Sequence, residues 1–327
     1  MPQASNYDRF PFIPSGEAHE CSAGWSAIAE RLPRNGILCV ECYPGADVPH
    51  IAAELVPRLP PAHVICTLDL FKSADELDKT FAPYLTDDPV FGHMSNITLD
   101  AYFDPAKLQM AKELIARESP ESLIVIVGAG AVLLADHDRT LVYADMARWE
   151  IQLRYRSGKL GNLGLDNQAA TFSEKYKCGF FLEWRVADRH KQLLLPDIDF
   201  LLDTNDALKP KMITGDAFRN TLAQLIHRPF RVVPYFDPGP WGGHWMEEVC
   251  NLPDDRPNYA WCFDCVPEEN SLLLGFGDER IEIPAIDLVF SHPIGLLGEA
   301  VYACFGAEFP IRFDLLRSEE RRVGTEC

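Results

Sequence analysis

Two short segments of this chain carry residue types that could bind a ligand or a metal ion. One is the turn 40–47 (VECYPGAD), and the other is the segment 231–248 (RVVPYFDPGPWGGHWMEE). In the second segment Trp241, Gly242 and Gly243 stand together. Glycine lets a backbone approach a ligand closely, and aromatic rings supply pocket walls. These three residues therefore have two possible roles: the wall of a pocket, or the filling of a seam between two domains.

The turn 40–47 stands where a phosphate-binding loop would follow the first strand of a parallel sheet. Such a loop reads G-x-x-x-x-G-K-[ST], because glycines admit the phosphates, lysine neutralises them and Ser/Thr holds magnesium. Only Gly45 fits this pattern: Val40 replaces the first glycine, Ala46 the lysine and Asp47 the Ser/Thr. The carboxylate of Asp47 would repel a phosphate but suits the N-cap of a helix. We expect no phosphoryl transfer from this degenerate loop.

Three arginines lie close together in the segment 148–156. Arg148, Arg154 and Arg156 could form a basic patch, or they could be a solvated helix face paired with Glu150. The second interpretation is favoured, because oppositely charged residues four apart pair on a helix surface.

Two further charged clusters receive structural interpretations. Asp87 and Asp88 precede a proline, a composition typical of a turn. Asp188, Arg189 and His190 are consecutive, so their side chains should diverge rather than converge on one site. For His244 we expect no metal ion, since no second ligand stands at a companion spacing.

The elements that must position these residues follow from the apolar pattern. Apolar runs alternate with amphipathic helical segments up to about residue 206, which indicates an α/β fold with a parallel sheet covered on both faces. The expected strands include NGILCVE (35–41), HVICTLDL (63–70), SLIVIVGAGAVLL (122–134) and IDFLLDTND (198–206). Beyond a boundary near Arg228, short runs such as NSLLLGF (270–276) and ERIEIPAIDLVF (279–290) indicate antiparallel β structure.

Composition narrows the classes of partner. The net charge is -19, so the chain would repel nucleic acid and anionic membranes. No apolar run is long enough to cross a bilayer and no export signal opens the sequence, which favours a cytoplasmic location. The C-x-x-C pairs Cys39/Cys42 and Cys262/Cys265 are over two hundred residues apart. Neither has a neighbouring partner pair, so no zinc ribbon is predicted.

The order of elements over about residues 36–205 resembles the uridine kinase and phosphoribulokinase branch of the P-loop kinases. The likeness is clearest in IVIVGAGAVLLADHDRTLVYADMARWEIQLRYR, which is similar to the family's strand, loop and arginine-bearing lid helix. The resemblance implies a kinase-like α/β domain whose phosphate loop has lost its chemistry. An active uridine-kinase-like phosphotransferase is disfavoured because Ala46 replaces the lysine.

The region after residue 228 resembles the type I mannose-6-phosphate isomerases, which are zinc-dependent cupins. The likeness rests on W-G-G at 241–243, on Trp261, Pro267 and Ser271 in W-x5-P-x3-S, on LLGEAVYACFG (296–306), and on FPIRFDLL (309–316). It implies that Trp241, Gly242, Gly243, Trp261 and Ser271 line a pocket for a small sugar phosphate. Tyr259 and Val266 depart from the family, which usually has Glu and His there.

The ligands that bind zinc in that family would come after residue 316 and are absent here. Instead 317–327 reads RSEERRVGTEC, which looks like a translated sequencing adapter. We therefore expect a degenerate kinase-like domain at 1–228, the truncated start of a β-rich cupin domain at 229–316, and a non-native tail at 317–327. We expect a full-length parent to bind zinc and to catalyse aldose–ketose isomerisation. We expect this fragment to bind no metal ion and to catalyse no reaction. The alternative is a non-catalytic sugar-phosphate or nucleotide sensor.

Overall fold

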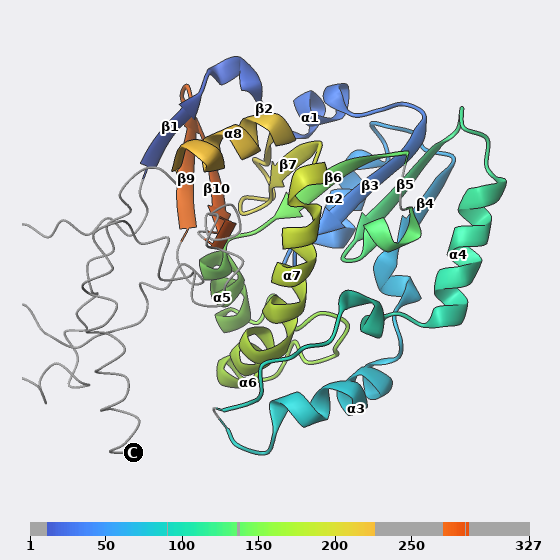
Figure 1. Cartoon of the computed structure of the whole chain (residues 1–327), viewed down its shortest axis with the longest axis vertical. Helices are drawn as coiled ribbons and strands as arrows, with labels where there is room; N and C mark the ends of the chain where they lie inside the picture. The colour runs from blue at the N-terminus through green and yellow to red at the C-terminus, as the bar shows by residue number, and fades with distance from the viewer. Residues whose placement is uncertain (1–11, 90, 136–137, 226–270, 285, 288–327) are drawn as a thin grey trace, which may run out of the picture. The chain divides into compact units, whose positions relative to one another are not determined.

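A seven-stranded sheet forms the centre of the computed structural model shown in Figure 1, which describes residues 12–89, 91–135, 138–225, 271–284 and 286–287. Residues 14–219 and 274–283 make up one compact unit. The other residues of the chain form a second unit, most of which lies outside the described ranges.

The strand order in this sheet is β2-β8-β7-β6-β3-β5-β4. Strands β3 to β7 run parallel to one another, β8 is antiparallel to β7, and β2 is antiparallel to β8. The bounds are β2 Cys21–Ala23, β3 Gly36–Cys42, β4 His63–Cys66, β5 Leu123–Gly128, β6 Arg139–Asp145, β7 Phe200–Asp203 and β8 Lys211–Thr214. The predicted α/β class with a mainly parallel sheet is confirmed.

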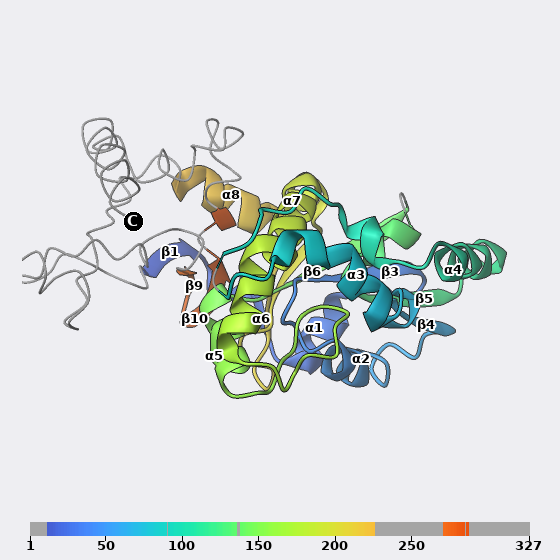
Figure 2. The same ribbon diagram turned by 90° about the horizontal axis from the view of Figure 1, so that it is seen from below.

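Helices cover both faces of this sheet (Figure 2). The α-helices are α1 Trp25–Arg31, α2 Val48–Leu55, α3 Ala74–Leu85, α4 Pro105–Arg117, α5 Arg148–Arg156, α6 Phe172–Cys178, α7 Trp184–Leu194 and α8 Gly215–Leu225. A π-helical turn, Gly179–Glu183, joins α6 to α7. Short 3-10 turns lie at Ala18–Glu20, Thr67–Leu70, Leu99–Tyr102, Ala131–Leu134 and Leu195–Asp197.

Alternation along β3 shows how the sheet divides its side chains between the two layers. Leu38, Val40 and Cys42 belong to a buried apolar cluster that also contains residues of α1 and α2. Successive side chains of a strand point to opposite faces, so Glu41 points to the other face. There it lies 3.4 Å from His190 of α7. One face of the sheet is therefore apolar, while the other carries buried charge.

Two predicted strands are shorter than the sequence indicated. HVICTLDL is a strand only to Cys66 and continues as the turn Thr67–Leu70, and SLIVIVGAGAVLL ends as a strand at Gly128. The second strand stops because Gly128 and Gly130 adopt φ angles of +125° and +81°, which extended backbone does not allow. Beyond them, Ala131, Val132 and Leu134 are buried in the turn Ala131–Leu134 instead.

The later part of the described chain contributes a β-hairpin. Strands β9, Ser271–Phe276, and β10, Glu279–Pro284, are neighbours joined by a two-residue turn, and β1, Phe12–Gly16, pairs with β9. The strands predicted at NSLLLGF and at the start of ERIEIPAIDLVF are confirmed. A further run of the same kind, YAWCFDCV (259–266), also predicts a strand, and it lies outside the described residues together with the tail 317–327.

Candidate functional site

A cavity of about 930 Å³ lies at the carboxyl ends of the parallel strands. It is bounded by the loop after β3, the start of α2, the second half of α5 and the segment 157–168. In the strand order, β4 lies toward one edge of the sheet from β3, and β6 lies toward the other edge. The direction in which successive strands are added therefore reverses beside β3. Ligands of open α/β sheets bind at such a switch point. The cavity is therefore the candidate site.

Most backbone donors of the loop after β3 are paired within the protein. The N–H group of Tyr43 donates to the Ala144 carbonyl of β6 at 2.9 Å, that of Ala46 to the Tyr43 carbonyl at 3.1 Å, that of Val48 to the Ala46 carbonyl at 3.0 Å and that of His50 to Oδ1 of Asp47 at 3.0 Å. Pro44 and Pro49 have no N–H to offer. A phosphate loop works by aiming several backbone N–H groups at its ligand. Most of the donors of this loop are already used.

The four residues compared with a phosphate-loop pattern, Val40, Gly45, Ala46 and Asp47, have different structural roles. Val40 lies inside β3 and is fully buried, so the turn itself begins only at Tyr43. Gly45 has a φ of +105°, and an added Cβ there would lie 2.7 Å from Cγ1 of Ile151. Ala46 packs against the apolar cluster. Asp47 is the N-cap of α2, as predicted, because its side chain accepts from His50.

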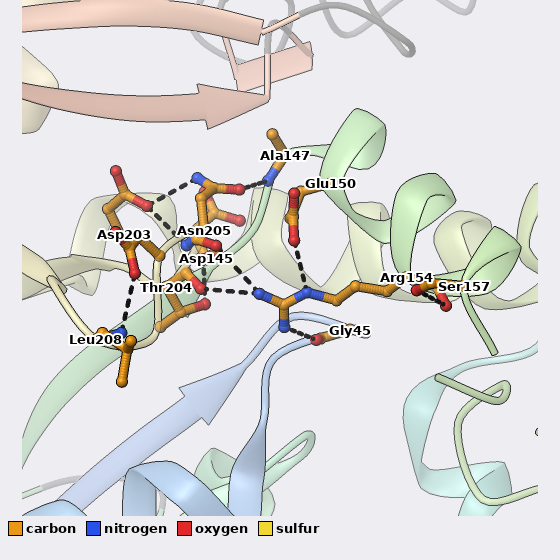
Figure 3. A network of polar contacts seen from close by, with 11 residues as sticks. Gly45, Asp145, Ala147, Glu150, Arg154, Ser157, Asp203, Thr204, Asn205 and Leu208 are labelled. Carbon is orange, nitrogen blue, oxygen red and sulfur yellow. Dashed lines mark hydrogen bonds and ion pairs between the residues drawn. The ribbon is translucent and has the colours of Figure 1, made fainter. Parts of the chain in front are cut away.

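Arg154 of α5 joins this loop to the segment after β7, as Figure 3 shows. Its Nη1 donates to the Gly45 carbonyl at 3.1 Å, and its Nη2 donates to the Asn205 carbonyl at 3.1 Å and lies 3.5 Å from that of Thr204. Its Nε donates to Oε1 of Glu150 at 2.9 Å. The predicted pair with Glu150 exists, but the guanidinium is mostly buried and holds two loops together.

Arg148 corrects the prediction of a solvated helix face. Its side chain is fully buried, pairs with Asp188 and donates to the hydroxyl of Tyr43 at 3.3 Å. That hydroxyl donates in turn to Oδ1 of Asp188 at 2.8 Å. Burial raises the pKa of Tyr43 well above its usual value, so the hydroxyl keeps its proton. The first turn of α5 points into the protein rather than toward solvent, which the spacing of the arginines did not show.

Two more buried carboxylates, Asp145 and Glu41, lie between α7 and the sheet. Lys191 lies 2.5 Å from Oδ2 of Asp145, and burial raises the pKa of that carboxyl even though the ammonium opposes the rise. Glu41 accepts hydrogen bonds from the N–H groups of Gly130 at 2.6 Å and Val132 at 3.1 Å. As expected, consecutive residues of α7 diverge: Asp188 binds Arg148, Arg189 reaches the carbonyl of Ile97, and His190 lies near Glu41.

The far wall of the cavity is a preformed loop over 157–170. The ammonium of Lys175 donates to the carbonyls of Leu160 at 3.2 Å and Gln168 at 3.0 Å, which holds the two ends of the loop together. Asn162 donates to Oε2 of Glu183 at 2.6 Å. Burial raises the pKa of Glu183, which is the last residue of the π-helical turn. Glu183 also lines the cavity, so it is a candidate-site residue that the sequence analysis missed. π-Helical turns are frequent at functional sites.

Some of the remaining residues singled out in the sequence lie outside the described ranges, and the others lie within them. Trp241, Gly242, Gly243, His244 and Trp261 lie outside the described residues, as does the pair Cys262/Cys265. Ser271 is the buried first residue of β9. Cys39 and Cys42 are free thiols on opposite faces of β3. The turn predicted at Asp87-Asp88 is present, because Oδ1 of Asp88 accepts from the N–H of Phe91 at 2.7 Å.

None of the helices that the structure describes is both long and apolar enough to cross a bilayer. Within the same ranges, no three or more His, Cys, Asp or Glu side chains are grouped to hold a metal ion.

The parallel sheet with a cavity at its carboxyl edge places the described unit among the mixed α/β proteins. Residues 24–227 match the family described as a domain of unknown function (DUF8485), and the chain belongs to that family. No curated protein and no solved structure matches the chain. The matched range contains every strand of the seven-stranded sheet except β2, the loop after β3 and all the residues around the cavity.

Proposed function

We propose that residues 24–227 form a non-catalytic ligand-binding domain of P-loop-kinase-like architecture, which senses a sugar phosphate or a nucleotide. The observation that carries this proposal is the cavity of about 930 Å³ beside a loop that is closed to phosphate. A cavity of this size suits a metabolite of that class. The loop that would perform phosphoryl transfer has kept its place at the sheet edge but lost the donors that the reaction needs.

The loss of phosphoryl transfer follows from charge and from hydrogen bonding. Catalysis of this reaction depends on cations and backbone donors that are aimed at the charge of the transferring group. Ala46 supplies no cation, and the carboxylate of Asp47 already occupies the N-terminus of α2. A ligand phosphate beside Asp47 would meet like charge and few unpaired donors. We therefore assign binding, and no phosphoryl transfer, to this domain.

The side chains around the cavity offer a different place for a phosphate. The cationic lining residues are Lys72, Arg154 and Lys159, and the acidic ones are Asp47, Glu150, Asp166 and Glu183. Arg154 is engaged by Glu150 and by carbonyls. The ammonium of Lys159 makes no hydrogen bond or ion pair with the described residues, and that of Lys72 uses one donor on the carbonyl of Ala101 at 2.8 Å. An ammonium has three donors, so we assign the phosphate to Lys72 and Lys159.

The test is a binding panel on the whole chain with fructose 6-phosphate, mannose 6-phosphate, UMP and ATP. Titration calorimetry should detect at least one ligand, and Leu153→Trp should abolish its binding because Leu153 lines the cavity and is 41% exposed. Leu193→Trp is the matched control, since Leu193 is a helical leucine that is 76% exposed and does not line the cavity. Absence of binding by every compound, or ATP-dependent phosphorylation of a sugar or nucleoside, would contradict the proposal.

For residues 229–316 we propose, on the sequence landmarks alone, the start of a cupin domain from a mannose-6-phosphate-isomerase-like parent. The landmarks Trp241-Gly242-Gly243 and Trp261 support this assignment, and they lie outside the described residues. Zinc would be held in the parent by residues beyond 316, so no catalytic step is assigned to the residues present here. Zinc content and interconversion of fructose 6-phosphate and mannose 6-phosphate, measured on the full-length parent, test the assignment. A metal-free parent without this activity would reject it.

A further inference from the structure

Arg154 contacts the cavity on one side and a second polar cluster on the other. Its guanidinium holds the carbonyl of Gly45, in the loop that lines the cavity, and the carbonyl of Asn205, which follows β7. A planar guanidinium presents its donors in a fixed geometry, so it cannot follow one of these carbonyls without weakening its bond to the other. A displacement of the loop after β3 therefore changes the hydrogen bond between Arg154 and the Asn205 carbonyl.

Asn205 and Asp203 hold the β9–β10 hairpin. The side-chain amide of Asn205 donates to the carbonyl of Glu282 at 3.0 Å, and the N–H of Glu282 donates to Oδ2 of Asp203 at 2.8 Å. Asn205 also donates to Oδ1 of Asp203, through its backbone N–H at 2.9 Å and its side chain at 2.7 Å. Both backbone groups of Glu282 thus depend on the short segment 203–205.

The same segment is fixed to the start of α5. Oδ1 of Asn205 accepts from the N–H of Ala147 at 2.8 Å, and Figure 3 shows this bond beside the contacts of Arg154. The network from the cavity to the hairpin is therefore continuous, and each link is a hydrogen bond between residues of one compact unit.

We propose that Arg154 couples the cavity to the β9–β10 hairpin, so that occupation of the cavity changes how firmly Glu282 is held. This inference rests on the proposed binding function and describes its output. A bound ligand that moves Gly45 or Glu150 alters the position of Arg154, and Asn205 passes the change to β10. In the sequence, residues 226–270 precede the hairpin and residues 288–327 follow it.

The test is amide hydrogen exchange of Glu282, measured by NMR in the whole chain without ligand. Arg154→Gln should make this amide exchange about tenfold faster, the scale of losing one stabilising hydrogen bond. Arg154→Lys should act in the same direction, because an ammonium cannot reproduce the planar fork, and it serves if the glutamine variant does not fold. Arg156→Gln is the matched control: it lies on the same helix and stacks on Trp149 and Phe172, away from the network.

The same measurement on Leu153→Trp tests occupation of the cavity. Leu153 lines the cavity, and the indole ring is larger than the leucine side chain, so it takes up cavity volume. We expect Glu282 exchange to change by about threefold or more relative to Leu193→Trp. Equal exchange in Arg154→Gln and Arg156→Gln, or in the two tryptophan variants, would overturn the coupling. Because no ligand is added, this result is independent of the binding panel: a panel without binders rejects the proposed function, whereas an unresponsive Glu282 rejects only the coupling.

Discussion

Oδ1 of Asp47 lies 3.0 Å from the backbone nitrogen of His50 and accepts its hydrogen bond. A carboxylate of the protein thus occupies the helix N-terminus at which a phosphate-binding loop would hold its ligand. The interaction stabilises α2 and at the same time closes the position to an anion. This single contact links the stability of α2 to the proposed absence of phosphoryl transfer.

Replacement of Asp47 tests both consequences of that contact. Asp47→Ala should lower the free energy of unfolding by about 1 kcal/mol, while Asp47→Ser should cost less because serine also caps helices. Urea denaturation measures both values. The double substitution Ala46→Lys with Asp47→Thr should leave the affinity for ATP, measured by calorimetry, no higher than that of the wild-type chain, since most loop amides stay paired and Val40 stays in the strand. A clear gain in ATP affinity over the wild-type chain would show that the side chains alone closed the site.

The buried pair of Arg148 and Asp188 should dominate the stability of the α5–α7 contact. Asp188→Asn leaves a fully buried guanidinium without its counter-charge, and we expect a loss of about 3–5 kcal/mol in the free energy of unfolding. Asp216→Asn is the matched control, because it breaks an Asp–Arg pair whose carboxylate is 86% exposed. That change should cost less than about 1 kcal/mol. Similar losses in the two variants would mean that the buried pair contributes little.

Asp203 should make stability depend on pH in the acid range. Burial raises the pKa of its carboxyl from 3.8 to about 6. The folded state therefore binds this proton more tightly than the unfolded state, and its stability should rise as the pH falls from about 7 to about 4. The contribution is at most about 3 kcal/mol, at 1.36 kcal/mol for each pKa unit. Above pH 6 this contribution is lost, because the buried carboxyl is then ionised.

The difference between the wild-type chain and Asp203→Asn isolates this effect from other titrating groups. Chemical denaturation at several pH values should show the wild-type chain gaining stability relative to the variant as the medium is acidified from pH 7 to pH 4. A constant difference across this range would show that Asp203 has an ordinary pKa in the folded protein.

Lys175 should determine how firmly the loop 157–170, which forms the far wall of the cavity, is held in place. Lys175→Met removes the ammonium that holds the carbonyls of Leu160 and Gln168, and we expect hydrogen exchange to rise in peptides from 157–170. Lys177→Met is the control on the same helix, because the ammonium of Lys177 binds the carbonyls of Thr86 and Asp88 instead. It should loosen 86–88 and leave the cavity wall unchanged. The same exchange pattern in both variants would contradict separate roles.

The helix α6, the π-helical turn and α7 show where sequence reasoning stopped short. No helix was predicted over 172–194, although this stretch carries Glu183, Asp188 and Lys191. Its hydrophobic pattern is obscured by charged residues that turn out to be buried, because each finds a partner on another element. A buried strand such as GILCVEC, in which Glu41 stands among apolar residues, was the available signal that the facing layer is polar.

The sequence by itself determined the central parallel strands, the α/β class, the cap at Asp47 and the absence of a phosphate-loop lysine, because apolar periodicity and capping are local properties of the chain. It did not indicate β1, β2 or β8. Only the tertiary structure decided which charges meet. Arg148 and Asp188 are 40 residues apart, and Arg154 and Gly45 are 109 apart. The sheet order brings them together, and burial of a charge is tolerated only where the fold supplies its partner. That pairing is a consequence of topology, which no local pattern of residues encodes.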